Sequence, residues 1–329
     1  MKGGRGNNFG LRTRDMAKAG HFAMNREVAN KAASFSTAAT VADRFNQFVK
    51  FAKEQGLRRL EEVNRELVIS YGQKLANHEA TSKDAKSTLS VAYAQNLVSA
   101  VNTVMNAATR GQWKSVSPTK DCVTTDKSTG KKNAIGKRSN VRQAPATSID
   151  RHRVEAAQAA MTERGRAIVG LARDFGLRSK EASLINAKSA LNEARNTGKV
   201  TIIYGTKGGK AREVPITHDR QIASLSRAVD VQSERRSLVP TTQTWDQFRN
   251  GELRASRETL QTHGVTGIHD LRAAYASERY QTLTGERTPL EGGQASKADD
   301  LAARKVLAVE LGHGRERVDV IASYIGGRP

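Results

Sequence analysis

Four short stretches in the second half of the sequence carry side chains that could act together on an anionic ester. They are FGLRSKEA, GTKGGK, IHDLRAAY and LGHGRERVDVIASYI. Their six candidate residues are Arg178, Lys207 (with Lys210 as its alternative), His269, Arg272, His313 and Tyr324. An arginine is always protonated and can hold two oxygens of an anion at once. A phenol has a pKa of about 10, so it is a weak nucleophile at neutral pH. The set favours attack of a tyrosine on a phosphodiester, with two arginines meeting the transition-state charge.

Tyr324 lies close to the C-terminal end of the sequence. His313 follows a Leu-Gly pair that closes an apolar helical pattern, and Tyr324 is the only tyrosine after it. Residues near the end of a chain are usually loose unless something ties them down. Tyr324 is therefore either an aromatic anchor for the tail or the reacting group itself.

In this order, the stretches resemble the catalytic domain of the tyrosine recombinases, the phage-integrase family. The matching motifs are Gly176-Leu177-Arg178 with Glu181, Lys207 in a hairpin turn, His269-x-x-Arg272, Leu311-Gly312-His313, and Tyr324 on a later helix. The strand after the turn, residues 212–216, also looks like the family. The resemblance covers roughly residues 150–329, and the helical region before it is similar in shape to the family's core-binding domain.

The resemblance implies a catalytic role for each matched residue. Arg178 and Arg272 would clamp the phosphate, and Tyr324 would be the nucleophile that forms a 3′-phosphotyrosine. Lys207 would protonate the leaving 5′ oxygen, with Lys210 as the close alternative. His269 would accept the phenol proton or orient the phosphate, and His313 would hydrogen-bond the phosphate. The reaction implied needs neither a nucleotide cofactor nor a metal.

Other chemistries fit the sequence less well. GTKGGKAR departs from the phosphate-binding loop G-x-x-x-x-G-K-[ST], because Ala211 stands where a hydroxyl residue should be. A metal-dependent nuclease requires clustered carboxylates, whereas Asp270 and Glu310 are far apart in the sequence. His263 and His269 have no cysteine or third ligand at zinc-site spacing. The sequence therefore predicts no metal site.

The charge balance indicates a polyanionic partner. The chain has 329 residues, a formal net charge of +21 and a pI near 10.3, which favours binding to DNA or RNA. The single cysteine, Cys122, excludes a disulfide within one chain and fits a reducing compartment. No apolar run approaches membrane-spanning length, and the N-terminus lacks the apolar core of a signal peptide. We therefore expect a cytoplasmic protein that works on DNA, with no membrane partner.

The pattern along the chain predicts a mainly helical fold with a small β-hairpin. We expect a basic N-terminal arm at 1–35, a helical DNA-binding domain at 36–114, a basic linker at 115–147 and a catalytic domain at 148–329. Apolar residues at helical spacing predict helices over 37–56, 65–79 and 90–111. β-branched residues around a Gly-rich turn predict the hairpin at 199–216. The resemblance implies a SAM-like core-binding domain followed by the recombinase catalytic domain.

The predicted function is a site-specific recombinase that integrates or excises a mobile element. Its expected partners are double-stranded DNA at attachment or core sites, three further copies of itself in a homotetramer, and a DNA-bending or directionality factor. Two alternatives remain open: a non-catalytic DNA-binding or architectural protein that keeps the fold, and a type IB topoisomerase-like enzyme. Since the segment after Tyr324 is short, we expect other residues to make the contact that many relatives make with a longer C-terminal segment.

Overall fold

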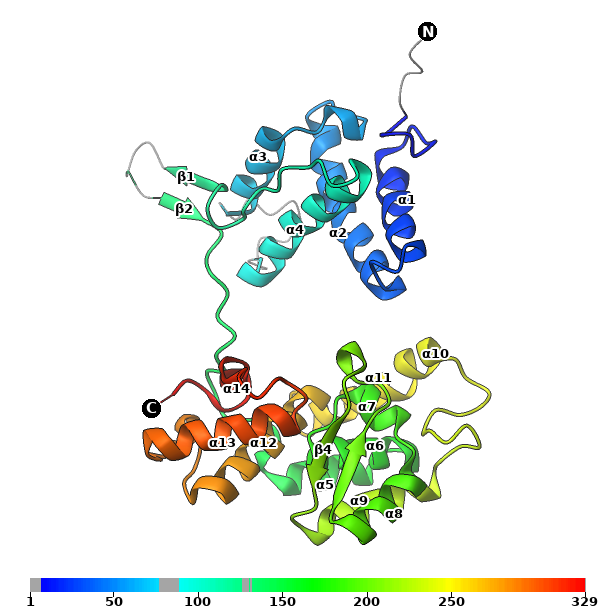
Figure 1. Cartoon of the computed structure of the whole chain (residues 1–329), viewed down its shortest axis with the longest axis vertical. Helices are drawn as coiled ribbons and strands as arrows, with labels where there is room; N and C mark the ends of the chain where they lie inside the picture. Colours follow the sequence, from blue (N-terminus) through cyan, green and yellow to red (C-terminus); the bar gives the residue numbers. More distant parts are fainter. Residues whose placement is uncertain (1–6, 77–88, 126–129, 131, 329) are drawn as a thin grey trace. The chain divides into compact units, whose positions relative to one another are not determined.

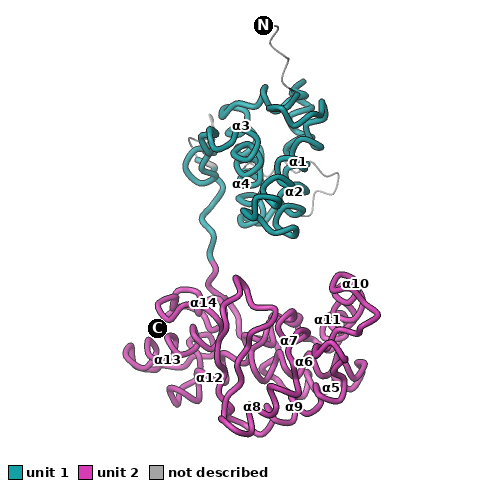
Figure 2. Tube along the Cα trace, turned by 45° about the vertical axis from the view of Figure 1, so that its right-hand side comes forward, with its two compact units in different colours: residues 1–139 teal, residues 140–329 magenta. Residues whose placement is uncertain are grey.

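The computed structural model describes residues 7–76, 89–125, 130 and 132–328. Parts of the expected arm, second helix and linker, and the last residue, lie outside these described residues. The chain divides into two compact units, unit 1 (Met1–Ser139) and unit 2 (Asn140–Pro329), coloured separately in Figure 2. Within the described residues, no helix is both long enough and apolar enough to cross a membrane.

Unit 1 is built mainly from helices that pack around one apolar core (Figure 1). Its helices are α1 (Met16–Ala29), α2 (Phe35–Glu54), α3 (Arg65–Ala76) and α4 (Val91–Ala108), with a short 3₁₀ helix, η1 (Leu60–Glu62). Asp15, Ser34 and Ser90 cap the first turns of α1, α2 and α4 by accepting backbone N–H groups. Phe45 and Phe48 of α2 are fully buried in this core. The helices predicted at 37–56 and 90–111 are present, and the described part of 65–79 is helical to Ala76.

The expected N-terminal arm differs from the structure. Residues 16–29 form α1, which packs against both α2 and α4. Met16, Ala19, Ala23 and Met24 are buried in the core of unit 1. The side chains on this face are small or unbranched, so the segment reads as weakly patterned although it packs closely. Residues 16–29 are therefore part of the folded unit.

The expected linker also differs from the structure over much of its length. Residues 115–135 belong to unit 1. Val116, Cys122 and Ile135 are buried in its core, although each stands among polar residues in the sequence. Two short strands, β1 (Val123–Thr125) and β2 (Lys132–Ala134), pair antiparallel within this region. Burial raises the pKa of the Cys122 thiol to about 11. Residues 136–146, which we call the connector, follow Ile135 and form neither helix nor strand.

Unit 2 is mainly helical with one β-hairpin. Its helices are α5 (Arg151–Ala159), α6 (Glu163–Phe175), α7 (Ser179–Leu184), α8 (Ala187–Thr197), α9 (Asp219–Asp230), α10 (Trp245–Asn250), α11 (Glu252–Thr262), α12 (Ile268–Thr284), α13 (Lys297–Glu310) and α14 (Val318–Ile325). Short 3₁₀ helices are η2 (Thr147–Ile149), η3 (Lys207–Gly209) and η4 (Pro289–Glu291). The strands β3 (Lys199–Ile202) and β4 (Arg212–Pro215) pair antiparallel at the predicted position, with Val200 opposite Val214.

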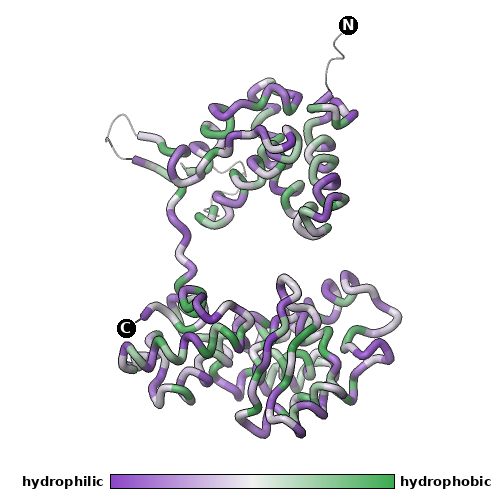
Figure 3. The backbone as a smooth tube through the Cα atoms, viewed as in Figure 1, coloured by the Kyte–Doolittle hydropathy of each residue, from purple (hydrophilic) through white to green (hydrophobic). Residues whose placement is uncertain are grey.

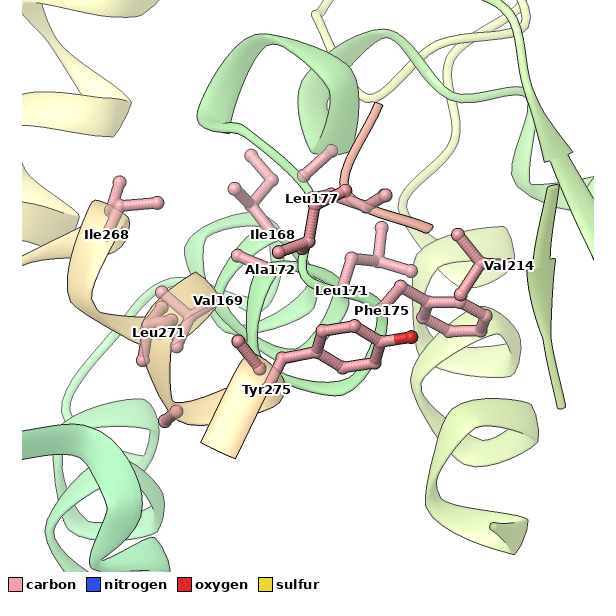
Figure 4. Close-up of a cluster of buried hydrophobic side chains, with 14 of the residues drawn as sticks. Ile168, Val169, Leu171, Ala172, Phe175, Leu177, Val214, Ile268, Leu271 and Tyr275 are labelled. Atoms are coloured by element: carbon pink, nitrogen blue, oxygen red, sulfur yellow. The ribbon is translucent and has the colours of Figure 1, made fainter. Parts of the chain in front are cut away.

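Helix α6 supplies much of the core of unit 2. Its residues from Ala167 to Ala172 are buried, as is Phe175 in its last turn, and it packs against α9, α12 and α11. Figure 4 shows these side chains gathered with Leu271 and Tyr275 of α12 and Val214 of β4. Along the helices of both units, hydrophobic and hydrophilic residues alternate in short runs, as expected where one helix face is buried (Figure 3). The predicted mainly helical fold class is confirmed.

Because α1 is packed into unit 1, truncating one of its buried side chains should destabilise that unit. Replacing Met24, which is 1% exposed, with alanine should lower the free energy of unfolding of unit 1 by about 2–5 kcal/mol. Phe22→Ala on the same helix is the control, because Phe22 is 46% exposed and should change stability by less than about 1 kcal/mol. Urea unfolding can be followed by Trp113 fluorescence in a Trp245→Phe background. Equal, negligible effects of both substitutions would mean that residues 16–29 are an undocked arm.

Candidate active site

Five of the six candidate catalytic residues come together in unit 2, at the ends of helices. Arg178 is the N-cap residue, directly before the first residue of α7. His269 and Arg272 lie in the first turns of α12, so the predicted shared helix is present. His313 follows α13, and Tyr324 lies in the last turn of α14.

The Tyr324 hydroxyl lies against two of these residues. Arg272 Nε donates a hydrogen bond to it over 3.1 Å, and His313 Nε2 lies 3.2 Å away. The ring centroids of His269 and Tyr324 are 5.8 Å apart. His313, rather than His269, is thus at hydrogen-bond distance from the phenol oxygen. The tyrosine side chain is buried among groups that could hold a phosphate and move a proton.

Arg272 is held in place by main-chain oxygens. Its guanidinium is fully buried and donates to the carbonyl oxygens of Gly176 and Leu311, besides Tyr324. Gly176 ends α6 with a φ of +60°, a left-handed conformation that favours glycine, and a Cβ there would meet the Tyr275 ring. Burial lowers the pKa of Arg272 to about 10, so this side chain is still a cation at neutral pH.

A buried carboxylate, Glu181, ties the arginines of the site together. Its side chain is 0% exposed and accepts from Arg178 Nη1 at 2.7 Å and from Arg212 at 2.7 and 2.8 Å. Arg272 Nη1 lies 4.0 Å from the same carboxylate. Burial acts to raise the pKa of Glu181, but the Arg212 guanidinium and the backbone N–H and charge of Arg178 outweigh it and lower this pKa to about 2. One fixed negative charge therefore holds three cations near the tyrosine.

Arg212 is a further site residue, to which the sequence motifs assign no role. Its side chain is buried beside Gly312, and its Nε donates to the Glu310 carbonyl oxygen over 2.7 Å. Gly312 has a φ of +68°, and a Cβ there would press on Arg212, which explains a glycine before His313. The alternation of β4 could have revealed Arg212, because it shares the buried face of that strand with Val214. A buried arginine requires a carboxylate partner.

Both histidines of the site are surrounded by cations. Burial, together with Arg272 and Arg178, lowers the pKa of His269 below its ordinary value. Burial and the same two arginines lower the pKa of His313 to about 4. Both imidazoles are therefore neutral at neutral pH, and a neutral imidazole can accept a proton or a hydrogen bond.

Lys207 and Lys210 lie on the exposed turn between β3 and β4. Lys207 begins η3, and Lys210 follows it directly. Neither lysine has an ion-pair partner among the described residues. The structure therefore places the sixth candidate, Lys207, on a solvent-exposed loop and outside the cluster around Tyr324. Its role stays a prediction.

The carboxylates near the site are all engaged by arginines or hydroxyls. Asp270 pairs with Arg142, and Glu310 accepts from Arg279 at 2.9 Å and from the Tyr275 hydroxyl at 2.8 Å. In the part of the chain that the structure describes, no group of three or more His, Cys, Asp or Glu side chains could hold a metal ion. The groups around the Tyr324 hydroxyl are thus cations and imidazoles, and the Glu181 carboxylate behind them is engaged by arginines.

The residues after Tyr324 are anchored within unit 2. The buried Arg304 pairs with Asp300 at 2.8 Å and donates to the carbonyl oxygens of Gly326 at 3.1 Å and Gly327 at 2.8 Å. Gly326 also packs closely on Leu290. This contact fixes the C-terminal end of α14, so the tail is tied down independently of the Tyr324 hydroxyl.

The sequence of unit 2 matches a known family. Residues 136–278 match the model of a family described as integrase. The matched range contains four of the six candidate catalytic residues and ends before His313 and Tyr324. The chain matches no curated protein.

Solved structures share the fold across most of the chain. A lambda integrase dimer bound to a COC′ core site is 13% identical with a TM-score of 0.55, covering 94% of this chain and 96% of that one. A post-cleavage complex of XerH site-specific recombinase bound to palindromic difH substrate is 15% identical with a TM-score of 0.54, covering 90% and 78%. A lambda integrase tetramer bound to a Holliday junction is 14% identical with a TM-score of 0.53, covering 97% and 80%.

The family match and the shared fold agree with each other. At these identities the solved structures establish the fold and leave the chemistry to the site itself. The resemblance to the tyrosine recombinases, which the order of the motifs predicted, is confirmed.

The Glu181 cluster predicts a specific dependence of stability on pH. The folded-state pKa of about 2 lies below the ordinary value of 4.5, so the stabilisation is complete above pH 4.5 and is lost as the pH falls toward 2. Glu181→Gln should lower the free energy of unfolding of unit 2 by about 3–5 kcal/mol at neutral pH, because it leaves buried arginines without their partner. The difference from the native chain should shrink toward zero near pH 2.

Urea unfolding followed by Trp245 fluorescence, in a Trp113→Phe background, measures this difference. Glu213→Gln is the matched control, since Glu213 pairs with Lys199 at the surface and should change stability by about 1 kcal/mol or less. A Glu181→Gln effect as small as the control, or one that does not depend on pH, would contradict the assignment.

Proposed function

We propose that this protein is a site-specific DNA recombinase, an integrase that cuts and rejoins DNA through a 3′-phosphotyrosine at Tyr324. The observation that carries the proposal is the contact of the Tyr324 hydroxyl with Arg272 at 3.1 Å and His313 at 3.2 Å. Arg178 donates to the same Leu311 carbonyl oxygen as Arg272. A phosphate held by these two arginines would lie beside the phenol oxygen, as an attack requires.

The proposed step forms one bond and breaks one. The phenol oxygen of Tyr324 attacks phosphorus and becomes esterified to the 3′ end of the cut strand, while the bond from phosphorus to the 5′ oxygen breaks. His269 accepts the phenol proton, with His313 as the alternative because it already contacts the hydroxyl. Arg178 and Arg272 hold the nonbridging oxygens, and removing one such donor typically costs about 3–4 kcal/mol of transition-state stabilisation.

The leaving 5′ oxygen needs a proton, and Lys207 is the proposed donor. It lies on an exposed turn without an ion-pair partner among the described residues, so it can reach toward bound DNA. Lys210 on the same turn is the alternative. The phosphotyrosine keeps the energy of the ester, so a 5′ hydroxyl from a second duplex can attack it and reseal the strand without a nucleotide cofactor.

We extend the proposal to the assembly. The net charge of +21 favours electrostatic binding of the chain to the phosphates of a duplex. The solved relatives include a lambda integrase dimer on a core site and a tetramer on a Holliday junction. By analogy, four copies would act on two attachment sites, in the cytoplasm, to integrate or excise a mobile element. A DNA-bending or directionality factor would assist.

The central test is covalent capture of DNA. A duplex selected from a randomised pool by binding to Tyr324→Phe, and then nicked at successive positions to trap the cut strand, is incubated with the native chain. A protein–DNA adduct that survives a denaturing gel is expected from the native chain and not from Tyr324→Phe. Tyr280→Phe, which removes a hydroxyl bonded to Asp300, should keep the adduct.

The outcomes separate the candidate functions. Tight binding without an adduct from the native chain favours a non-catalytic DNA-binding protein. An adduct without joining of two different duplexes favours a topoisomerase-like enzyme. Joining of two duplexes, lost in Tyr324→Phe, supports the recombinase.

The identity of the general acid makes a second prediction. Lys207→Ala should slow cleavage of the ordinary duplex by about 10²- to 10⁴-fold, because the 5′ oxygen then leaves without a proton. A duplex with sulfur in place of the 5′ bridging oxygen should be cut at nearly the native rate, since a thiolate leaves without protonation. Lys210→Ala is the matched control and should cut both duplexes well. Rescue by sulfur in Lys210→Ala instead would assign the role to Lys210.

A further inference from the structure

Asp270 binds the segment that leads into unit 2. It stands on α12 between His269 and Arg272, and its side chain is 4% exposed. Its carboxylate accepts from the Thr147 hydroxyl at 2.7 Å and from the backbone N–H of Ser148 at 2.9 Å. It also accepts from the Arg142 guanidinium. Burial acts to raise the pKa of Asp270, but these partners outweigh it and lower the pKa, so the group is ionised.

Arg142, in the connector, contacts both helices that carry the proposed reacting groups. Its side chain pairs with Asp270 of α12, next to His269. Its backbone N–H donates to the carbonyl oxygen of Ala322 over 2.9 Å, two residues before Tyr324 on α14. The guanidinium Nε also donates to the Ala144 carbonyl oxygen at 2.7 Å, within the connector itself.

These contacts form one chain of bonds from α12 to α14. The ion pair fixes the side chain of Arg142, and the side chain fixes the backbone N–H that bonds α14. Asp270 and Arg142 are 128 residues apart in sequence, so the link exists only in the folded unit. An ion pair of this kind, in which the carboxylate is buried and the guanidinium is partly exposed, contributes little net stability but restricts geometry when every partner is satisfied.

We propose that Asp270 and Arg142 are positioning residues whose ion pair sets the spacing between His269 on α12 and Tyr324 on α14. The inference rests on the proposed function, because the spacing matters for attack by Tyr324. It concerns the rate of the cleavage step and not the binding of DNA. Breaking the pair lets α14 shift relative to α12, and a displacement of about 1 Å at a reacting group can cost about 10²-fold in rate.

The test compares the cleavage rate with DNA affinity on the nicked duplex described above. Asp270→Asn and Arg142→Ala should each slow single-turnover adduct formation by about 10- to 100-fold, while the affinity for the duplex stays near the native value. Arg142→Lys keeps the cation and should recover a large part of the rate. Arg153→Ala is the control, because it removes the same charge from an exposed pair with Asp150 and should cleave normally.

The inference would be overturned if both Asp270→Asn and Arg142→Ala formed the adduct at the native rate. A loss of affinity as large as the loss of rate, or no recovery in Arg142→Lys, would also overturn it, since either points to general destabilisation. Thermal unfolding of each variant identifies any that fails to fold. If Asp270→Asn fails to fold, the comparison of Arg142→Ala with Arg142→Lys tests the inference. Absence of an adduct from the native chain would instead count against the proposed function.

Discussion

The buried carboxylate of Glu181 is the constraint on which the rest of the site depends. Three guanidiniums, those of Arg178, Arg212 and Arg272, lie within 4.0 Å of it. Cations so close together repel one another, and burial makes that repulsion larger. The single carboxylate offsets part of the repulsion while leaving an excess of positive charge. That excess is what a phosphodiester transition state requires. Burial, together with that excess of charge, lowers the pKa values of His269 and His313 and keeps both imidazoles neutral.

The main chain supplies the rest of the positioning. The carbonyl oxygens of Gly176 and Leu311, at the C-terminal ends of α6 and α13, accept the buried Arg272. Carbonyl groups at the C-terminal end of a helix have no hydrogen-bond partner within the helix. A cation there donates to these carbonyl oxygens and interacts favourably with the negative end of the helix dipole. The left-handed conformations of Gly176 and Gly312 let the backbone turn sharply after the ends of α6 and α13. Helix packing by α6 thus fixes the position of the proposed phosphate clamp.

The sequence predicted those features that depend on local pattern. Helix α4 was predicted from apolar residues at helical spacing, and the β3–β4 hairpin from β-branched runs around a glycine-rich turn. Helix α1 was missed because residues 1–35 are basic and their apolar pattern is weak. In the structure, a Cβ at Gly20 would collide with the Phe45 ring, so the glycine permits close helix packing. Its meaning appears only when the neighbouring helix is in place.

At the site, too, the features set by local sequence motifs could be predicted, and those set by tertiary packing could not. The order of the motifs singled out Arg178, Arg272, His313 and Tyr324 before any fold was known, and the structure brings them together. The contact between Arg142 and Asp270 could not be predicted, because it depends on where the connector crosses α12 and α14. The expected linker boundaries failed for a similar reason: Val116, Cys122 and Ile135 are isolated apolar residues that become core only by tertiary packing.

Mass spectrometry of the trapped adduct tests the central claim most directly. After the DNA is trimmed with nuclease and the protein is cut with trypsin, the residual nucleotide marks the peptide that carried the reacting side chain. We expect the residual nucleotide on the peptide that starts at Val318, in which Tyr324 is the only tyrosine. The tyrosine should be joined through a phosphate to the 3′ oxygen of that nucleotide. A mark on a peptide that carries any other tyrosine, or a 5′ linkage, would contradict it.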